Sequence, residues 1–503
     1  MEEATEICKL RLFLKLVAQI DAKQKDKIEP LPDIDFNIRA GNTLVGYARY
    51  DDVKKAAGGN LFDAEEAMSR IDDRLQTIDA AADQFRRQQT ELGGSVSAED
   101  KQALTTLYKN LEAELDDFLA AEYGVKKKDL ATWKANTKPF HWFCDFHSIV
   151  QSGGFDVIIG NPPYVEYAKV RGVYSLTSEY DAFLGNLYAA CAYRSNALLS
   201  PRSYCSLIVP VSLASTDRME ELRVVLKENH TLHQASFSTR PQKLFDGAEQ
   251  RLTIYIQSPS VSPTEFSGGY LKWSQEERNH LFETLSFVDT DTIMVRNHIW
   301  PKIRTELERT ILHKVANAGS NIRLSATGSG VRLYYKNTGL RYFNTVTLRP
   351  PKCWINGVAT NSSRETIIEI KSEWAASIHA LLLSSAFFVV YQALSNCRDL
   401  NPSDLITFGL PPSIKTDSAL KRLSTEVETD CTSKAKLLTM NNKLTGEVVL
   451  ESMSPSRSKP IIDEIDRVLA KHYDFTDEEL DFIINYDIKY RMGADASTPD
   501  NED

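Results

Sequence analysis

The 503-residue chain is 42% hydrophobic and 25% charged, a composition typical of a globular protein with about two to four domains, and no stretch approaches the ~20 apolar residues of a membrane helix. Its formal net charge of −10 argues against DNA binding through overall charge, although an acidic protein can still carry a local basic face. The acidic N-terminus lacks a signal-peptide pattern and the scattered cysteines include no C-x-x-C, so we expect free thiols, a cytoplasmic location and no membrane association.

Residues 1–50 are predicted to contain an amphipathic helix, a linker and a short strand that ends near Asn42. The apolar residues of the helix recur at three- and four-residue spacing, which places them on one side. Asparagine is also common in turns that precede a helix, so Asn42 has an ordinary structural explanation. The apolar side of the helix is formed by Ile7, Leu10, Leu14 and Val17.

Residues 51–139 are predicted to form a helical hairpin inserted between strands of a sheet. Two apolar stripes indicate two long helices, separated by Gly93-Gly94-Ser95. We expect the two helices to pack on each other as a solvated arm; a grip on DNA or on a partner is the alternative. The stripes are Met68, Ile71, Leu75, Ile78 and Phe85 in the first helix, and Leu104, Leu107, Leu111, Leu115 and Phe118 in the second.

His141, Cys144 and His147 form an H-x2-C-x2-H cluster that has the spacing of a metal site. No fourth ligand lies nearby in the sequence, and the segment is rich in aromatic residues. Packing is therefore the favoured interpretation of this cluster, and we predict no metal site.

The most informative segment follows an apolar run at 155–160, which reads as a buried strand that ends at Gly160. Asn161, Pro162, Pro163 and Tyr164 come directly after it, which places them at the C-terminal end of a predicted parallel strand. Ligands of open α/β sheets bind at that edge.

This loop has the chemistry of a pocket for an aromatic amine. The two prolines stiffen the backbone and remove two donors. The side-chain carbonyl of Asn161 and the backbone carbonyl of Pro162 are two acceptors that suit an NH2 group, and Tyr164 offers a flat face for stacking a planar ring such as adenine. The alternative is a rigid Pro-Pro turn with Asn161 as a turn residue and Tyr164 as a packing residue.

Residues 140–299 alternate predicted strands and helices, a pattern typical of half of a doubly wound sheet. Asn186 and Tyr188 open a predicted helix, for which simple packing is an alternative role. Phe245 lies in a predicted turn and is either a second aromatic face for a base or a core residue.

Residues 300–460 change character and mix helical, strand-like and turn segments. The stretch 320–352 contains arginines and lysines but no acidic residue, so we expect the DNA-binding face there. A second segment with aromatics, amides and arginine follows at 391–402. The candidate contacts to phosphates and base edges are Arg332, Lys336, Arg341, Arg398 and Asn401, each of which has a solvated surface position as its alternative.

Residues 461–493 are predicted to be a C-terminal helical segment, in which Thr476 and Glu479 form a capping box and Gly493 ends the helix. Residues 494–503 are small and acidic, and we expect them to be disordered.

The run FDVIIGNPPYVEY resembles the catalytic motif of amino-methylating DNA methyltransferases. More closely, the chain resembles the Eco57I-like (type IIG) adenine-specific methylases of restriction-modification and phage-defence systems. The resemblance covers almost the whole chain. Its further segments are PLPDIDFNIRAGNTLVG at 30–46, FHWFCDFHSIVQSGGFDVIIGNPPY at 140–164, FSTRPQKLFDGAEQRLTIYI at 237–256 and FTDEELDFIINYDIKYRMG at 475–493.

The resemblance implies an α/β fold: a partial Rossmann-like class I methyltransferase sheet with a helical insertion, followed by a mixed α/β target-recognition domain at 300–460. It implies S-adenosylmethionine as methyl donor and double-stranded DNA as partner. The Asn161–Tyr164 loop would be catalytic, with Asn42, Asn186 and Tyr188 near the donor. Tyr164 and Phe245 would stack on an adenine flipped out of the helix.

The chain departs from this family in one respect. A glycine-rich donor-binding loop and an acidic ribose-binding residue are expected near the first strands, yet the only G-x-G is at 328–330. Met1 therefore resembles an internal position of a longer protein, and the chain is predicted to be the C-terminal half of a split or truncated methyltransferase, with an N-terminal methyltransferase half or other defence-system subunits as candidate partners. A non-catalytic DNA-recognition module and a glutamine-N5 methyltransferase remain alternatives. No PD-x-D/E-x-K pattern is evident, so we predict no cleavage of DNA by this chain alone.

Overall fold

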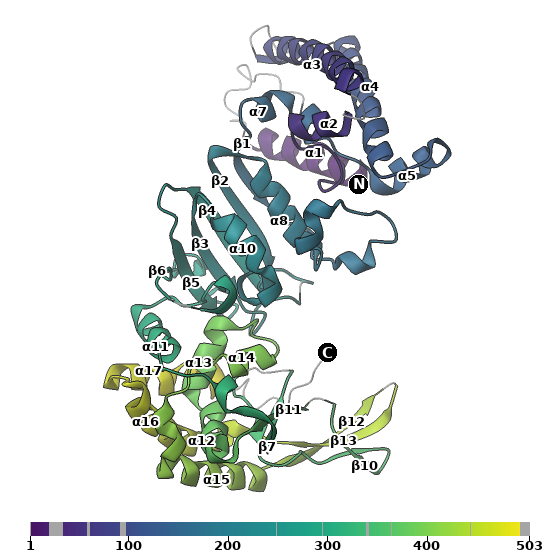
Figure 1. Cartoon of the computed structure of the whole chain (residues 1–503). Helices are drawn as coiled ribbons and strands as arrows, with labels where there is room; N and C mark the ends of the chain where they lie inside the picture. The colour runs from purple at the N-terminus through teal and green to yellow at the C-terminus, as the bar shows by residue number, and fades with distance from the viewer. Residues whose placement is uncertain are drawn as a thin grey trace. The chain divides into compact units, whose positions relative to one another are not determined.

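The computed structural model describes residues 2–19, 34–57, 61–90, 97–247, 249–293, 295–338, 342–363, 365–442 and 444–492 (Figure 1). The chain divides into two compact units, Met1–Leu207 and Ile208–Asp503. The boundary falls inside strand β2 (Leu199–Pro210), which therefore contributes residues to both units. Three of the sequence predictions lie outside the described residues: the Gly93-Gly94-Ser95 turn, Arg341 and the tail at 494–503.

The first unit opens with helix α1 (Glu2–Val17), as the apolar spacing predicts. The expected apolar side is not packed, because every large apolar side chain of this helix is at least 40% exposed. Lys9 bridges the helix to Asp35 at 2.9 Å.

A helical arm follows, and its core is formed by the two apolar stripes that the sequence predicts. Helices α3 and α4 lie side by side, with Ile71 and Leu75 of one and Leu111 and Leu115 of the other fully buried (Figure 1). Ser97 caps α4 by accepting a hydrogen bond from the backbone N–H of Asp100 at 3.0 Å. The helices of this part are α2 (Tyr50–Ala57), α3 (Leu61–Thr90), α4 (Ala98–Glu122), α5 (Leu130–Thr137), α6 (Trp142–Asp145) and α7 (His147–Gln151).

Strand β1 (Phe155–Gly160) pairs in parallel with β2, with Val157 opposite Tyr204 and Gly160 opposite Leu207. Helix α8 (Leu187–Ala197) is the connection that precedes β2. The expectation that β1 is a buried strand is wrong for one of its faces. Val157 is 62% and Ile159 81% exposed, because nothing in the described part of the chain covers that face.

The strands belong to a six-stranded sheet with the order β1-β2-β4-β3-β5-β6. In the second unit, β3 pairs antiparallel with β4 and parallel with β5, and β5 pairs antiparallel with β6. Helices α8 and α10 separate β1, β2 and β3, whereas β3 to β6 follow one another without an α-helix between them; the mixed sheet and its helices confirm the predicted α/β class. The elements are α9 (Ser212–Ser215), α10 (Glu220–Lys227), β3 (His230–Phe237), β4 (Leu252–Pro259), β5 (Glu265–Leu271) and β6 (Val288–Asp289).

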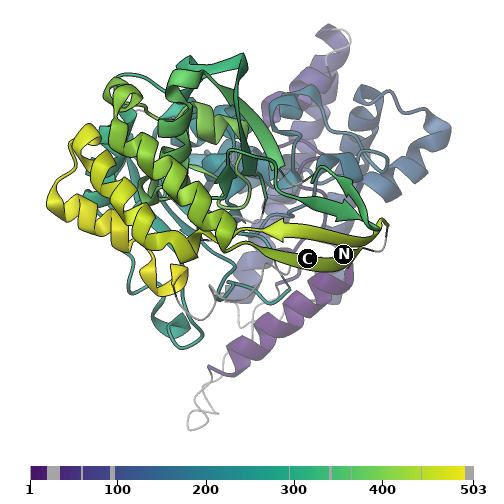
Figure 2. The ribbon, with the colours of Figure 1, turned by 90° about the horizontal axis from the view of Figure 1, so that it is seen from below.

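The rest of the second unit is a mixed α/β body with its own apolar core, built largely from α12, α13, α15 and α16. Strands β12 (Lys436–Asn442) and β13 (Gly446–Ser452) form a long hairpin that projects from these helices (Figure 2). The helices are α11 (Glu306–Ala316), α12 (Ser372–Leu383), α13 (Ser385–Leu394), α14 (Pro402–Ile406), α15 (Ser418–Ser433), α16 (Lys459–Tyr473), α17 (Asp477–Asn485) and α18 (Ile488–Arg491).

Two small sheets complete this body, with strand orders β11-β7-β8 and β10-β9-β13-β12. Among the described residues, no single helix is long and apolar enough to cross a membrane; α12 and α13 reach that length and composition only together, with a 70° bend between them. The strands are β7 (Ala326–Lys336), β8 (Val346–Thr347), β9 (Cys353–Ile355), β10 (Val358–Thr360), β11 (Glu365–Ile370), β12 (Lys436–Asn442) and β13 (Gly446–Ser452).

Candidate functional site

The loop Asn161–Tyr164 begins where β1 ends, at the C-terminal end of a parallel strand pair. Asn161 is exposed, and the Tyr164 ring is half-buried. The Tyr164 hydroxyl donates a hydrogen bond to Asn161 Oδ1 at 2.6 Å. Burial raises the pKa of Tyr164 to about 12, so the phenol stays neutral and remains a donor at physiological pH. The loop therefore holds the side-chain carbonyl of Asn161 by an internal bond.

The loop is tied to the start of α8. The backbone N–H of Leu187 donates to the carbonyl of Val165 at 2.8 Å. Asn186 is the N-cap of α8, and its Oδ1 accepts a bond from the backbone N–H of Tyr188 at 3.4 Å. The Tyr188 side chain is buried in the core of this unit. Asn186 thus has a capping role, and the donor contacts predicted for both residues stay predictions.

Asn42 reaches the same region from far away in the sequence. Its backbone N–H donates to the carbonyl of Lys138 at 2.7 Å, and its Oδ1 accepts from the N–H of Leu44 at 3.2 Å. Leu44 packs in one apolar cluster with Leu187 and Val165. The structure therefore brings Asn42, the loop after β1 and the start of α8 together around one cluster.

A close backbone approach fixes the segment that carries Asn42. Gly46 has a φ of +137°, and a Cβ added there would lie 2.1 Å from the carbonyl oxygen of Phe140. The N–H of Phe140 in turn donates to the carbonyl of Val45 at 2.8 Å. Only glycine tolerates both the positive φ and this approach. The sequence contains the glycine, but its partner 94 residues later gives no local signal.

Phe245 and the predicted DNA-contacting residues belong to the second unit. The Phe245 side chain is 42% exposed. Arg398 is also exposed, with its Nε 3.9 Å from Asp399. Asn401 caps α14 in a reciprocal box with Asp404, which gives it a structural role beside the predicted one.

The acid-free stretch at 320–352 is less basic in the fold than in the sequence. Arg332 lies on β7 and donates to Glu369 of the neighbouring β11 at 2.9 Å. Arg349 forms two hydrogen bonds with the Glu451 carboxylate, at 2.7 and 2.8 Å, which lowers the pKa of that carboxyl. Lys336 also lies on β7, with its side chain half-buried. Acidic residues from distant segments thus neutralise part of the predicted basic face.

The histidines of the H-x2-C-x2-H cluster contact the helical arm. His141 Nδ1 accepts from the N–H of Tyr47 at 3.2 Å, and its Nε2 lies 3.1 Å from Asp116. His147 Nδ1 lies 2.7 Å from Asp79. Within the described ranges, no group of three or more His, Cys, Asp or Glu side chains is arranged to hold a metal ion. Each histidine contacts a carboxylate of a different arm helix, so the two residues join the α6–α7 segment to the arm.

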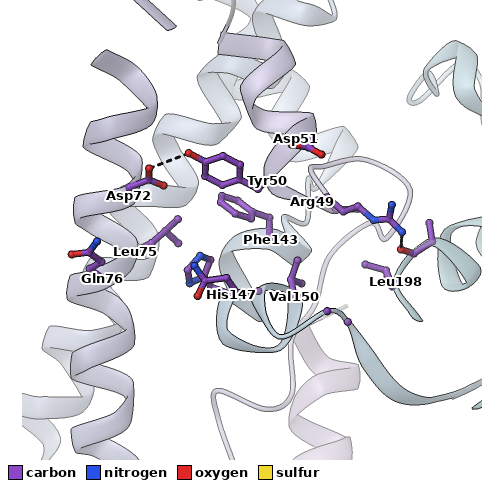
Figure 3. A pocket seen from close by; sticks show the side chains of 15 residues that line it. Arg49, Tyr50, Asp51, Asp72, Leu75, Gln76, Phe143, His147, Val150 and Leu198 are labelled. Carbon is purple, nitrogen blue, oxygen red and sulfur yellow. Dashed lines mark hydrogen bonds between the residues drawn. The ribbon is translucent and has the colours of Figure 1, made fainter. Parts of the chain in front are cut away.

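A cavity of about 570 Å³ lies at the opposite end of β1 from the loop. Its lining includes Gly153 and Gly154, which precede β1, and Tyr50, whose hydroxyl donates to Asp72 at 3.0 Å (Figure 3). Arg49 reaches across it to the carbonyl of Ala197. None of the predicted site residues lines this cavity.

Comparison with known proteins finds a family match in the first 245 residues of the chain. Residues 1–245 match the family described as Eco57I restriction-modification methylase. The resemblance of this segment to the Eco57I-like methylases is thereby confirmed. Over 357 residues the chain is also 28% identical to a putative type II restriction enzyme and methyltransferase, RM.MjaORFECS2P of Methanocaldococcus jannaschii. That match covers 59% of this chain and 29% of the relative, so the chain spans less than a third of the relative's length.

Solved restriction-modification enzymes are similar only at a distance. The type IIL enzyme MmeI in complex with DNA is 11% identical, with a TM-score of 0.37, over 84% of this chain and 71% of that chain. A nuclease-deletion mutant of the type ISP enzyme LlaGI in complex with a DNA substrate mimic is 10% identical, with a TM-score of 0.34, over 84% and 56%. Both TM-scores are low, so we assign no property of these enzymes to this chain.

Proposed function

We propose that the chain is the catalytic and target-recognition part of a cytoplasmic DNA adenine-N6 methyltransferase in a restriction-modification or phage-defence system. One observation carries the proposal: Asn161, Pro162, Pro163 and Tyr164 stand at the C-terminal end of a parallel strand, within the segment that matches a restriction-modification methylase. The bond between Tyr164 and Asn161 orients the amide carbonyl beside the ring.

The loop has the groups that bind and position a flipped adenine. The base must leave the duplex because its amine is paired and stacked there. Tyr164 stacks on the ring, while the Asn161 side-chain carbonyl and the Pro162 carbonyl accept the two N–H bonds of the amine. Asn161 Oδ1 has a second lone pair beside the one that Tyr164 occupies. These bonds turn the nitrogen lone pair out of conjugation, so positioning and electrostatics lower the barrier.

S-adenosylmethionine supplies the methyl group when bound, and the chain's own residues fit only part of that donor. Asn42 lies by the apolar cluster next to the loop, and Asn186 lies at the start of α8. Tyr188 is buried and its backbone N–H is bonded to Asn186, so a donor contact there would need this site to open. The 503 residues contain no glycine-rich loop of the expected D-P-x-x-G-S-G type. The remaining donor contacts must therefore come from elsewhere.

A second candidate function follows from that incomplete donor site. The chain would then be a DNA-recognition module, with Arg332, Lys336, Arg341, Arg398 and Asn401 as its contacts and no transfer of its own. The missing glycine-rich loop favours this candidate, whereas the intact Asn161–Tyr164 loop favours the enzyme.

The two candidates differ in a transfer assay with labelled S-adenosylmethionine and mixed-sequence double-stranded DNA. The enzyme predicts label in DNA that Asn161→Ala abolishes while DNA affinity survives. Asn110→Ala is the matched control, because Asn110 is exposed on α4, far along the chain from the loop. Undiminished transfer by Asn161→Ala would remove the assignment of the loop, and DNA binding with no transfer under any condition would favour the recognition module.

A further inference from the structure

The end of the helical arm carries lysines that acidic side chains do not neutralise. Lys126, Lys127 and Lys128 are consecutive and exposed between α4 and α5, and Lys138 is exposed where α5 ends. Within the part of the chain that the structure describes, none of these four side chains forms an ion pair. Adjacent lysines repel one another, and the N-terminus of a helix such as α5 disfavours cations, so the cluster does not stabilise the fold. Such a cluster suits a negatively charged ligand.

A second basic segment follows the Asn161–Tyr164 loop directly. It contains a short helical turn, Tyr167–Lys169, and the side chains of Lys169 and Arg171 are exposed. Neither cation forms an ion pair among the described residues. The Tyr167 hydroxyl accepts a hydrogen bond from the backbone N–H of Leu176 at 3.0 Å, which closes the segment on itself. The two cations are thus held five and seven residues after Tyr164.

The Lys138 end of the arm is joined to this segment through Asn42. The backbone N–H of Asn42 donates to the carbonyl of Lys138 at 2.7 Å. Burial raises the pKa of Tyr174, and a hydrogen bond with the Asn42 side chain acts against that rise. Leu176 packs both against the core of the arm and against the apolar cluster that contains Val165. The end of α5 therefore adjoins the segment at 165–176.

The lysine cluster between α4 and α5 approaches the same segment from its other end. Tyr123 lies three residues before Lys126, and its ring contacts Trp133 of α5 with the centroids 5.7 Å apart. Burial raises the pKa of Tyr123 to about 12, and the nearby phenol of Tyr167 adds to this shift. Both ends of α5 thus lie near the segment that follows the Asn161–Tyr164 loop, and all of these residues belong to the first unit.

These cations differ from the arginines of the acid-free stretch at 320–352. There Arg332 and Arg349 are bonded to Glu369 and Glu451, so a phosphate would have to displace a carboxylate. The exposed cations of the first unit have no such competitor among the described residues. In a chain with a net charge of −10, a local surplus of positive charge of this kind is what a polyanion needs for binding.

We propose that a basic surface of the first unit binds the phosphate backbone of the double-stranded DNA whose adenine enters the Asn161–Tyr164 loop. The inference rests on the proposed function for the identity of the polyanion. Contacts between lysine or arginine and phosphates hold and orient a duplex but do not read its sequence, so this surface leaves the choice of target to other residues. The basic surface consists of Lys126, Lys127, Lys128, Lys138, Lys169 and Arg171.

The test measures how tightly the full chain binds a fluorescent mixed-sequence DNA duplex at several salt concentrations. One variant removes the arm lysines and a second removes the two cations after the loop. The control removes three charges from exposed positions on α2 and β2 of the same unit, which also have no ion pair among the described residues. All the altered side chains are exposed, so no core contact is lost. The variants are Lys126→Gln/Lys127→Gln/Lys128→Gln, Lys169→Gln/Arg171→Gln and the control Lys54→Gln/Lys55→Gln/Arg202→Gln.

The expected losses follow from counterion release. Each phosphate contact contributes roughly fivefold to the affinity at about 0.15 M salt, so the arm variant should bind up to about 100-fold more weakly and the loop variant up to about 25-fold. The slope of log affinity against log salt should become shallower by about 2.7 and about 1.8, respectively. The control should lose less than about threefold and keep the wild-type slope. A wild-type chain that does not bind the duplex, or variants that match the control in affinity and slope, would overturn the proposal.

The outcomes separate this inference from the proposed function. Weaker DNA binding by both basic-surface variants, in a chain that transfers no methyl group to DNA, leaves the basic surface in place and removes the methyltransferase assignment. Methyl transfer to DNA that Asn161→Ala abolishes, together with unchanged DNA affinity and salt slope in both variants, does the reverse.

Discussion

Tyr164 is assigned two separable roles, a stacking face for a base and a hydroxyl that orients Asn161. Tyr164→Phe keeps the ring but removes the 2.6 Å hydrogen bond to Asn161 Oδ1. Tyr164→Ala removes both. Because the ring is only half-buried at the end of β1, neither change is expected to unfold the chain.

The size of each effect follows from the interaction that is lost. A hydrogen bond of this kind contributes about 0.5–1.5 kcal/mol, so Tyr164→Phe should lower kcat/KM by roughly 2- to 12-fold. Stacking of a base on an aromatic ring contributes about 1–3 kcal/mol. The sum predicts a loss of roughly 10- to 2000-fold for Tyr164→Ala, always larger than the loss for Tyr164→Phe.

The assay is methyl transfer to DNA at subsaturating substrate, with a separately expressed N-terminal methyltransferase half added in trans. Tyr50→Phe and Tyr50→Ala are the matched controls, since Tyr50 also donates a hydrogen bond, to Asp72 at 3.0 Å, but lines the cavity at the other end of β1. Equal losses for Tyr164→Phe and Tyr164→Ala would refute the stacking role, and activity in Tyr164→Ala equal to that of the wild type would refute both roles.

Three further predictions concern stability and are checked by urea unfolding. Burial raises the pKa of Glu265 to about 7, above its usual value in an unfolded chain, so the contribution of Glu265 to the free energy of unfolding should rise by at most about 3 kcal/mol as pH falls from 8 to 4. Glu265→Gln should lose this contribution, and identical pH profiles of the variant and the wild type would contradict it. Phe387→Ala leaves a cavity at a fully buried position on α13 and should lower the free energy of unfolding by about 3–5 kcal/mol. A decrease below about 1 kcal/mol would show that the core is not packed as described. Gly46→Ala should lower the free energy of unfolding by more than about 1 kcal/mol, because the new Cβ would meet the Phe140 carbonyl. Gly172→Ala has open space around it and should lower the free energy of unfolding by less. The reverse order would contradict the close approach at Gly46.

Features that depend on local spacing were predictable from the sequence. The stripes of α3 and α4 recur at helical spacing, and the residues expected to be apolar contacts are buried or packed against the core. The strand at 155–160 and the loop after it are also readable, because a short apolar run followed by glycine and two prolines has few other conformations.

Features that depend on distant segments were not predictable. The apolar run of β1 indicates a strand but cannot show that one of its faces stays uncovered. The acid-free stretch that contains Arg332 and Arg349 was expected to be basic, yet Glu369 and Glu451 arrive from 37 and 102 residues away. Asn42 donates its backbone N–H to the carbonyl of Lys138, which lies 96 residues later, and no local sequence pattern predicts that contact.

The candidate site was predictable in its centre and less so at its edges. Asn161 and Tyr164 were expected beside each other at the end of a strand, and the 2.6 Å bond between their side chains adds a contact that spacing alone does not reveal. Tyr188 has the position in the sequence expected for a donor contact, but its side chain points into the core. Helix packing competes with ligand contact at such a position, and only the three-dimensional arrangement decides which side chain is exposed.

The most direct test of the central claim is to identify the methylated product. Double-stranded DNA is incubated with labelled S-adenosylmethionine and the chain, with a separately expressed N-terminal methyltransferase half added in trans, and is then digested to nucleosides, which are separated. The account predicts label in N6-methyldeoxyadenosine, present with the wild type and Asn110→Ala and absent with Asn161→Ala. Label in cytosine or in protein glutamine, or label in adenine that persists in Asn161→Ala, would contradict it.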